Sequence, residues 1–441
     1  MARILLVVVF VSLILAITLL FTLSATPQIN LADSVNAIGQ STPIIVKVKD
    51  SHGIRRITAS VEQNGVHYSA WDTAQSARRI FWQRGAAEAS WNFKIGTQTI
   101  PQLKEGKARL IIEATSNDFR GKTARLEREV SVITRPPALT VDSEQHYLYR
   151  GMAELVTFAV SGYWTEAGVR VREQTFRSWP MPGGKPGLFS LFAFAWDVPA
   201  DISPVVYATN SAGNEITREI VVQFPKREQP KYRARDLQLD DRFIQKVLGE
   251  LDPSGSGDPV SRFVKINNEV RRANNRALSD LRLKTQSRFL WTEPFLQQHN
   301  SKVESNFADL RSYFYKGQKI DQQVHLGYDL AITSHVGVEA SNDGRVVYAA
   351  PLGIYGNCIV VDHGYSLQSI YGHLSEIAVH EGDSVKRGQI IGKSGQTGLA
   401  GGDHIHFSMQ LEGVQIDPRE WWDGHWIEDH VAKRIGLGSP N

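Results

Sequence analysis

The region from Pro27 to Phe224 repeats one pattern, a short run of strand-forming residues followed by a turn signal. Residues 57–61, for example, alternate apolar and polar side chains and lead to Asn64-Gly65, a strong signal for a β-hairpin. Alternation with a period of two puts one face of a strand in a core and the other face in solvent. The pattern therefore predicts that this whole region is built from β-strands.

Two stretches within this region, residues 110–137 and 204–225, look like copies of one unit. In each, a strand that ends in Ala-Thr leads through a turn rich in Gly and Asn to a second strand that runs into proline. The repeat, after about 100 residues, predicts two tandem β-sandwich modules that resemble immunoglobulin-like domains. They are assigned to residues 27–137 and 138–225. One large irregular β domain is the alternative.

Residues 226–300 change to helical patterning. Asp240 or Asp241 can cap a helix whose apolar residues recur at helical spacing, and Asp258 before a proline marks a second helix start. Short strands and glycine turns then return. They predict a compact, mostly antiparallel β domain, assigned to residues 301–430.

The N-terminus differs from the rest of the chain. Ile4 to Leu23 is an uninterrupted run without charge, and a helix needs ~20 such residues to cross ~30 Å of hydrocarbon. A cleaved signal peptide is the alternative, but Leu23-Ser24-Ala25 is an imperfect cleavage site. We therefore expect an uncleaved anchor at residues 1–25, single-pass in the inner membrane. Arg3 and the α-amine mark its cytoplasmic side, so the rest of the chain is expected in the periplasm or otherwise outside the cytoplasm.

The charge balance gives no reason to expect a nucleic-acid partner. Lys and Arg number 49 against 46 Asp and Glu, which leaves a formal charge of +3. The single cysteine, Cys358, excludes intrachain disulfides and a Cys-rich zinc site, and its strand-like context predicts a small buried hydrophobic residue. His363 is expected to be structural rather than pocket-lining, and Tyr371 to be a packing residue, although it could reach a substrate.

Three motifs in the last domain carry histidines and an aspartate. They are His-x-Gly-x-Asp at His325–Asp329, Tyr-Gly-His-Leu around His373, and His-x-His at His404 and His406. Residues two apart in a strand point the same way and lie ~6–7 Å apart, so His404 and His406 face one site. At that separation both need not bind one ion. One is therefore expected to be a ligand and the other to stand beside the open position of a metal.

His325 and Asp329 need a turn between them to share an ion. In an extended strand they would lie ~13 Å apart, but Gly327 permits a turn or bulge that brings them together. A helix would also place them on one face, as in the His-Glu-x-x-His zinc motif. No Glu follows His325, however, and Gly327 with Tyr328 is poor helix material. The turn is therefore predicted.

These motifs, with Gly413 and Asp417-Pro418 downstream, resemble those of the lysostaphin/LytM-type peptidoglycan zinc metallopeptidases, a murein endopeptidase family. The resemblance covers about Phe307 to Trp422, and three motifs in the same order make it highly specific. The predicted fold class is then mainly β. It comprises an N-terminal transmembrane helix, two Ig-like β-sandwich modules, a short helical linker region and a C-terminal antiparallel β metallopeptidase domain.

The resemblance implies that His325, Asp329 and His406 bind Zn²⁺ and that His373 and His404 are the catalytic histidines. Three protein ligands leave a fourth position for water, which is typical of catalytic zinc, and zinc lowers the pKa of that water to about 7. The two catalytic histidines could then position the water, move its proton and stabilise an oxyanion. The sequence does not divide these tasks between them.

The implied function is hydrolysis of the peptide cross-links of bacterial peptidoglycan, with its stem peptides as substrate. A non-catalytic wall-binding regulator that activates other cell-wall hydrolases is the alternative, although all five motif positions are intact. A biotinyl- or lipoyl-carrier domain, which the hairpin at residues 385–389 suggests, needs no histidine constellation and is disfavoured. The role of the β modules stays open between spacing from the membrane, autoinhibition and docking of envelope protein partners.

Overall fold

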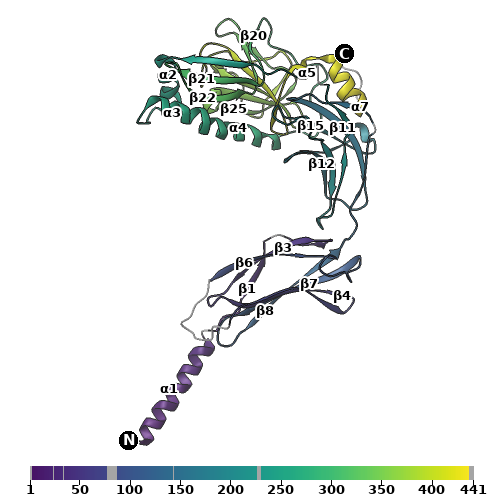
Figure 1. Ribbon diagram of the computed structural model, residues 1–441, viewed down its shortest axis with the longest axis vertical. Coiled ribbons are helices and arrows are strands. Elements are labelled where there is room, and N and C mark those ends of the chain that lie inside the picture. The colour runs from purple at the N-terminus through teal and green to yellow at the C-terminus, as the bar shows by residue number, and fades with distance from the viewer. Residues whose placement is uncertain are drawn as a thin grey trace. The chain divides into compact units, whose positions relative to one another are not determined.

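The computed structural model describes residues 2–22, 24–32, 34–76, 87–142, 144–225 and 230–436 (Figure 1). These residues divide into two compact units. Unit 1 comprises Met1–Ala138, Ser161–Glu166 and Ala208–Ile216, and unit 2 comprises Leu139–Val160, Ala167–Tyr207 and Thr217–Asn441. Residues 226–229, at the start of the predicted helical linker, lie outside the described residues.

The N-terminal segment forms helix α1, Ala2–Thr22. Leu23, the last residue of the apolar run, lies outside the described residues. Across the described part of the chain, no helix combines the length and apolar character needed to span a membrane. By this finding the prediction of an N-terminal transmembrane helix is wrong.

The first β module, in unit 1, is built from two sheets with the strand orders β1-β3-β6 and β2-β8-β7-β4-β5. Its strands are β1 (Gln28–Leu31), β2 (Ala37–Ile38), β3 (Thr42–Lys49), β4 (Ile54–Gln63), β5 (Val66–Ala74), β6 (Glu88–Ile95), β7 (Gly106–Ser116) and β8 (Thr123–Val132). The predicted hairpin is confirmed, since β4 and β5 pair up to Gln63 and Val66. Asn64 and Gly65 between them both have positive φ, 53° and 78°, as a type I′ turn requires.

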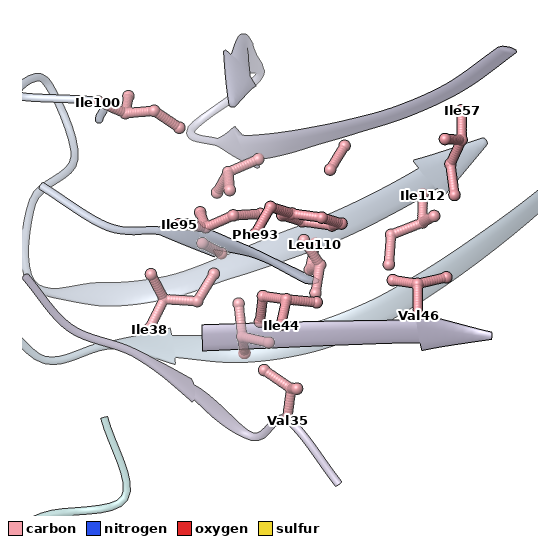
Figure 2. Packing of buried hydrophobic residues seen from close by; sticks show 14 of the residues in the cluster. Val35, Ile38, Ile44, Val46, Ile57, Phe93, Ile95, Ile100, Leu110 and Ile112 are labelled. Atoms are coloured by element: carbon pink, nitrogen blue, oxygen red, sulfur yellow. The ribbon is translucent and has the colours of Figure 1, made fainter. Parts of the chain in front are cut away.

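The core of this module forms where the two sheets face one another. Figure 2 shows Ile44 and Val46 of β3 beside Leu110 and Ile112 of β7, and all four are buried. Along β3 every second residue is buried, and the intervening residues are exposed except Ile45, which is half-buried. Burial of apolar area at about 25 cal/mol per Å² is therefore the main force that joins these sheets.

The second β module lies mostly in unit 2 and also has two main sheets, here four-stranded each, β14-β15-β11-β9 and β13-β12-β16-β17, with a short pair β10-β18. Its elements are β9 (Ala138–Val141), β10 (His146–Tyr147), β11 (Met152–Ser161), β12 (Glu166–Val171), β13 (Gln174–Arg177), β14 (Trp179–Pro180), η1 (Pro182–Gly184), β15 (Leu188–Phe194), β16 (Val205–Thr209), β17 (Glu215–Glu219) and β18 (Val222–Gln223). The domain boundaries expected from the sequence stay a prediction.

The region predicted to be a helical linker begins with a strand. Its elements are β19 (Ala234–Leu239), α2 (Asp241–Leu251), α3 (Pro259–Lys265), η2 (Ile266–Val270), α4 (Arg271–Asp280) and η3 (Leu281–Leu283). Both predicted caps are confirmed, because Asp240 accepts from the Phe243 amide and Asp258 from the Ser261 amide. The apolar faces of α2, α3 and α4 pack against the C-terminal β domain (Figure 1). Strand β19 was not predicted, and it pairs in parallel with β21.

The C-terminal β domain is antiparallel in its described strand pairs apart from β19 with β21, as predicted. Its largest sheet has the order β20-β23-β31-β27-β26-β25-β29, with β32 beside β31, and two smaller sheets are β24-β30-β28 and β19-β21-β22. The strands and the short helix η4 are β20 (Lys302–Ser305), β21 (Asp309–Tyr315), β22 (Gln318–His325), β23 (Tyr328–Ala331), β24 (Gly337–Glu339), β25 (Gly344–Pro351), η4 (Gly353–Tyr355), β26 (Asn357–Asp362), β27 (Leu367–Leu374), β28 (Glu376–Ile377), β29 (Ser384–Val385), β30 (Ile390–Lys393), β31 (Ile405–Leu411) and β32 (Val414–Ile416). Cys358 is buried in β26, as expected, and burial raises the pKa of its thiol.

Short helical turns follow the last strand, and they pack on the second β module within unit 2. They are α5 (Arg419–Trp422), α6 (Gly424–Ile427), η5 (Glu428–Ala432) and α7 (Lys433–Ile435). Glu154 of β11 is fully buried and bonds His430 Nδ1 at 2.9 Å, while Arg434 lies 3.9 Å from the same carboxylate. The buried charge of the module is thus matched by basic groups from the chain end.

Candidate metal centre

Three neighbouring strands deliver the residues of the first and third motifs to one point. His325 is the last residue of β22, Asp329 lies in β23, and His406 lies in β31, directly opposite Asp329 in the strand register. The chain between His325 and Asp329 turns, as predicted, instead of forming a helix. Gly327 is required in this turn, because a Cβ there would lie 2.6 Å from Cε1 of His406.

Three side-chain donor atoms converge at this point. The distances are 3.0 Å from His325 Nε2 to Asp329 Oδ1, 3.0 Å from His325 Nε2 to His406 Nδ1, and 3.4 Å from His406 Nδ1 to Asp329 Oδ1. Three donors on a tetrahedral zinc at ~2.0–2.1 Å would lie about 3.3 Å apart. Asp329 Oδ1 is also buried without a hydrogen-bond partner among the described residues. The set therefore fits a single zinc ion.

Neighbouring groups orient two of these donors. His325 donates from Nδ1 to the Asn306 carbonyl oxygen at 3.0 Å, which leaves the lone pair of Nε2 directed at the centre. Arg311, from β21, donates to Oδ2 of Asp329 and leaves Oδ1 for the centre. No local signal in the sequence marks Arg311, because its contact with Asp329 forms only once β21 pairs with β22.

The buried setting favours the protonation states that bind metal. Burial is the main cause that lowers the pKa of His325, and burial lowers the pKa of His406 to about 4, so both imidazoles are neutral near pH 7. Burial by itself would raise the pKa of Asp329, but its interactions with the neighbouring His325 and with the charged Arg311 hold that pKa well below its usual value. Neutral imidazole and ionised carboxylate are the ligand forms that zinc takes.

His373 reaches the same centre from β27. Its φ of 64° lies in the left-handed region, which non-glycine residues rarely adopt and which recurs at functional sites. Its Nδ1 donates to the Thr397 carbonyl oxygen at 2.8 Å, so Nε2 is left without that proton. The His373 ring lies 4.9 Å from that of His404 and 5.8 Å from that of His406, between centroids. Burial lowers the pKa of His373 well below its usual value, and His404 and His406 add to the effect.

His404 stands beside the donor set. Its Nδ1 bonds the Gly402 carbonyl oxygen at 2.9 Å, and its Nε2 lies 3.4 Å from Asp329 Oδ1. Burial lowers the pKa of His404, but the Asp329 carboxylate raises it by more. The structure thus brings all five predicted site residues together, with His406 among the converging donors and His404 adjacent, while their chemical roles stay a prediction.

The neighbouring aromatic and histidine positions are structural, as expected. His363 is buried, with Nδ1 bonded to the Asp343 carbonyl at 2.8 Å and Nε2 bonded to the Ser369 hydroxyl at 2.8 Å. The buried Tyr371 hydroxyl accepts from the Ser341 amide at 2.7 Å. These hydrogen-bond partners of His363 and Tyr371 lie outside the donor cluster.

A cleft of about 680 Å³ opens onto this centre. Asp329, His373 and His404 line one part of it, and residues of β19 and α2 line the other. The sequence predicted no role in the site for β19 and α2, because only the pairing of β19 with β21 brings them to the cleft. A cleft of this size can take an extended peptide over the donor set.

An antiparallel β domain that gathers two imidazoles, a carboxylate and two further histidines at a cleft defines a mononuclear metal centre of the hydrolytic kind. Residues 323–418 match the model of peptidase family M23. Residues 323–418 therefore form a peptidase M23 domain, in agreement with the LytM-type resemblance of the motifs. M23 peptidases are zinc metallopeptidases, in agreement with the donor set.

Two curated proteins and one solved structure illustrate the likeness. The chain is 33% identical over 96 residues to the DD-carboxypeptidase/endopeptidase Mpg of Neisseria meningitidis serogroup B, covering 22% of each chain. It is 40% identical over 118 residues to the peptidoglycan DD-endopeptidase ShyA of Vibrio cholerae serotype O1, covering 26% of each. The catalytic domain of lysostaphin from Staphylococcus simulans is 29% identical, with a TM-score of 0.24 over 28% of this chain and 92% of that domain. The match thus spans about a quarter of these curated relatives.

Proposed function

We propose that this chain is a zinc-dependent endopeptidase that hydrolyses peptide cross-links of bacterial peptidoglycan, with the stem peptides as substrate. The observation that carries the proposal is the spacing of 3.0–3.4 Å among His325 Nε2, Asp329 Oδ1 and His406 Nδ1. These are the spacings of ligands on one tetrahedral ion, and the segment belongs to a peptidase family. The M23 match supports the same reaction class.

His325, Asp329 and His406 would hold the zinc. When bound, zinc would supply a water whose pKa is near 7 and would polarise the carbonyl of the scissile bond. His373 and His404 each anchor Nδ1 on a backbone carbonyl, at Thr397 and Gly402, so Nε2 is the atom of each ring that faces the reaction. A ring whose Nε2 is unprotonated is suited to take the proton of the attacking water, and a ring that carries protons on both nitrogens is suited to donate from Nε2 to the developing oxyanion.

The same cluster excludes bulk water from one side of the reacting atoms. His325 and His406 are buried, and His404 and Asp329 line the cleft. A peptide laid in the cleft would cover the remaining side. Electrostatic interactions with the oxyanion then act in a medium of low dielectric constant, where they are stronger than in water.

Digestion of purified peptidoglycan by the full chain, followed by mass spectrometry, tests the proposal. We expect muropeptides with cleaved cross-links, lost on chelation and restored by zinc. His380→Ala, which changes an exposed histidine, should digest at the wild-type rate. A protein that binds the wall and zinc but cleaves no bond would instead be the non-catalytic regulator.

We also propose that the catalytic domain acts outside the cytoplasm, in the periplasm or beyond it, because peptidoglycan lies there. The β modules would then be available to envelope protein partners. Accessibility of the catalytic domain to an added protease in cells whose outer barrier has been opened tests this placement. A domain protected until the cytoplasmic membrane is lysed would contradict it.

A further inference from the structure

A single peptide group links His373 to helix α2. The carbonyl oxygen of Thr397 accepts the Nδ1 proton of His373 at 2.8 Å. The amide of Gly398, at the other end of the same planar peptide unit, donates to Oε1 of Glu250 at 2.5 Å. The carboxylate of Glu250 and the imidazole of His373 thus bind opposite ends of one peptide dipole.

Lys246, one helical turn before Glu250, binds the same loop, residues 396–398. Its Nζ donates to the carbonyl oxygens of Gln396 at 2.6 Å and Gly398 at 2.5 Å, and pairs with Oε2 of Glu250 at 3.2 Å. Both side chains are about one-third exposed, so the contacts are partly shielded from water. Bonds with an ionised partner are about twice as strong as neutral ones.

The C-terminal β domain holds the loop from its other side. The Thr397 hydroxyl donates to the Leu374 carbonyl at 2.8 Å and accepts from the Asn357 amide at 2.9 Å. Gly398 has a φ of 70°, and a Cβ there would lie 2.4 Å from the Gly356 amide. These contacts fix Thr397 and Gly398 against the β domain. The Gly398 amide takes its hydrogen-bond partner from α2.

We propose that Glu250 is a positioning residue for His373, acting through the Thr397–Gly398 peptide, and that Lys246 holds Glu250 and the flanking carbonyls in place. A charged acceptor on the N–H end of a peptide polarises it and makes its carbonyl a stronger acceptor. The His373 proton is thereby held on Nδ1, and Nε2 stays directed at the cleft. Both residues lie outside the M23-matched segment, so the device belongs to the helical region that precedes it. The inference rests on the proposed function for its kinetic consequence only.

Glu250→Ala and Glu250→Gln test the proposal in the full chain. We expect Glu250→Ala to lower kcat about 10- to 100-fold with KM within about twofold, because misplacing a reacting group by ~1 Å costs about that much. Glu250→Gln keeps an oxygen for the Gly398 amide and should recover most of the rate. Glu376→Ala removes an acid from an exposed pair with Lys393 in the same domain and serves as the matched control.

A second readout does not depend on hydrolysis. In ¹⁵N-histidine NMR spectra of the zinc-loaded chain, with the His373 signal assigned through His373→Gln, the wild type should show one tautomer, protonated at Nδ1. Glu250→Ala and Lys246→Met should broaden or shift that signal, while bound zinc stays unchanged. An unaltered His373 signal together with an unaltered kcat in Glu250→Ala overturns the inference. If the wild type cleaves nothing but its His373 signal responds, the positioning holds and the proposed function fails.

Discussion

The strands of the first β module and those of the C-terminal β domain bury different kinds of side chain. In the module, strands β3, β4 and β7 carry apolar residues into the core, and the buried ionisable groups Asp50, His52 and Asp118 lie outside the strands. In the C-terminal domain, strands carry His325, Asp329 and His406 inward to one point. Burying ionisable groups costs free energy unless they are bonded or bind a metal. Ionisable side chains that strands bring together at one buried point therefore indicate a ligand site.

The second β module also buries a charged group, Glu154, but pairs it with basic side chains. Glu154 has a matched set of basic partners, His146, His430 and Arg434. The donors at the candidate metal centre are instead arranged with Asp329 Oδ1 left without a hydrogen-bond partner among the described residues. Paired charge serves the attachment of two parts of unit 2, whereas convergent donors serve a ligand.

The largest effect should come from a site residue that does not bind the metal. We expect His404→Ala to lower hydrolysis about 10²–10⁴-fold, the usual contribution of a general acid or base, while zinc content stays close to that of the wild type. Rates on purified peptidoglycan and metal analysis of the same samples measure both quantities. If His404→Ala empties the site while His406→Ala stays loaded, the two roles are reversed.

The paired charge of the second module should affect stability instead of catalysis. Glu154→Gln leaves buried basic partners unmatched, which costs about 3–5 kcal/mol in the free energy of unfolding. Chemical denaturation at pH 7 measures the loss. Glu144→Gln, which changes an exposed acid paired with Arg434, is the matched control and should change little.

The same cluster predicts how stability depends on pH. Burial alone would raise the pKa of Glu154, but bonds from His146 and His430, with the charge of Arg434, lower it to about 2. A depressed carboxyl pKa gives stability that is present above the ordinary value near 4.5 and is lost as pH falls toward 2. Burial lowers the pKa of His146, yet Asp142 and Glu154 raise it by more. The stability that protonated His146 contributes is therefore fully present below pH 6.5 and is lost as the pH rises through the raised pKa.

The difference between wild type and Glu154→Gln should therefore shrink as pH falls from 4.5 toward 2. Unfolding free energies measured across this window check the sign. A difference that stays constant down to pH 2 would show that the Glu154 carboxylate is not stabilised by its partners.

A substitution in the core of the first module should lower the stability of that module without changing hydrolysis at the candidate site. Ile112 is fully buried, and Ile112→Ala should lower the stability of unit 1 by about 2–5 kcal/mol. Hydrolysis by the folded fraction should stay within about twofold of wild type. Val66→Ala, at a half-exposed position, is the control. A loss of hydrolysis that follows the loss of stability would contradict the separation of core and site.

The smallest effect should come from Arg311, which contacts the expected ligand Asp329. Arg311 donates to Oδ2 of Asp329, and losing such a partner costs about 10–100-fold in metal affinity. Competition with a chromophoric chelator compares Arg311→Met with the exposed control Arg345→Met. Equal affinity in the two variants would show that Arg311 does not orient the ligand.

Local chemistry decided what the sequence could predict. The turn at Gly327, the hairpin at Asn64-Gly65 and the cap at Asp240 each depend on a few adjacent residues, and the structure agrees. The three motifs also named all five histidine and aspartate residues at the centre. Arg311 and Glu250 carry no such pattern, because their roles arise only after strands pair and helices pack.

Long sequence separation explains the missed contacts. The Glu250 carboxylate and the Gly398 amide are 148 residues apart, and no local spacing reports such a contact. Strand β19 was likewise hidden in a region with helical patterning, since its partner β21 begins only at Asp309. The transmembrane prediction rested on the length of an uncharged apolar run and on an imperfect cleavage site after it, and no helix in the described part of the chain meets the requirement for a span.

Metal analysis of the purified full chain tests the candidate centre most directly. We expect close to one zinc per chain in the wild type and in His380→Ala, and near none in His325→Ala, Asp329→Ala and His406→Ala, because each change removes one of three protein ligands. Full zinc in all three ligand variants would contradict the assignment of the metal site.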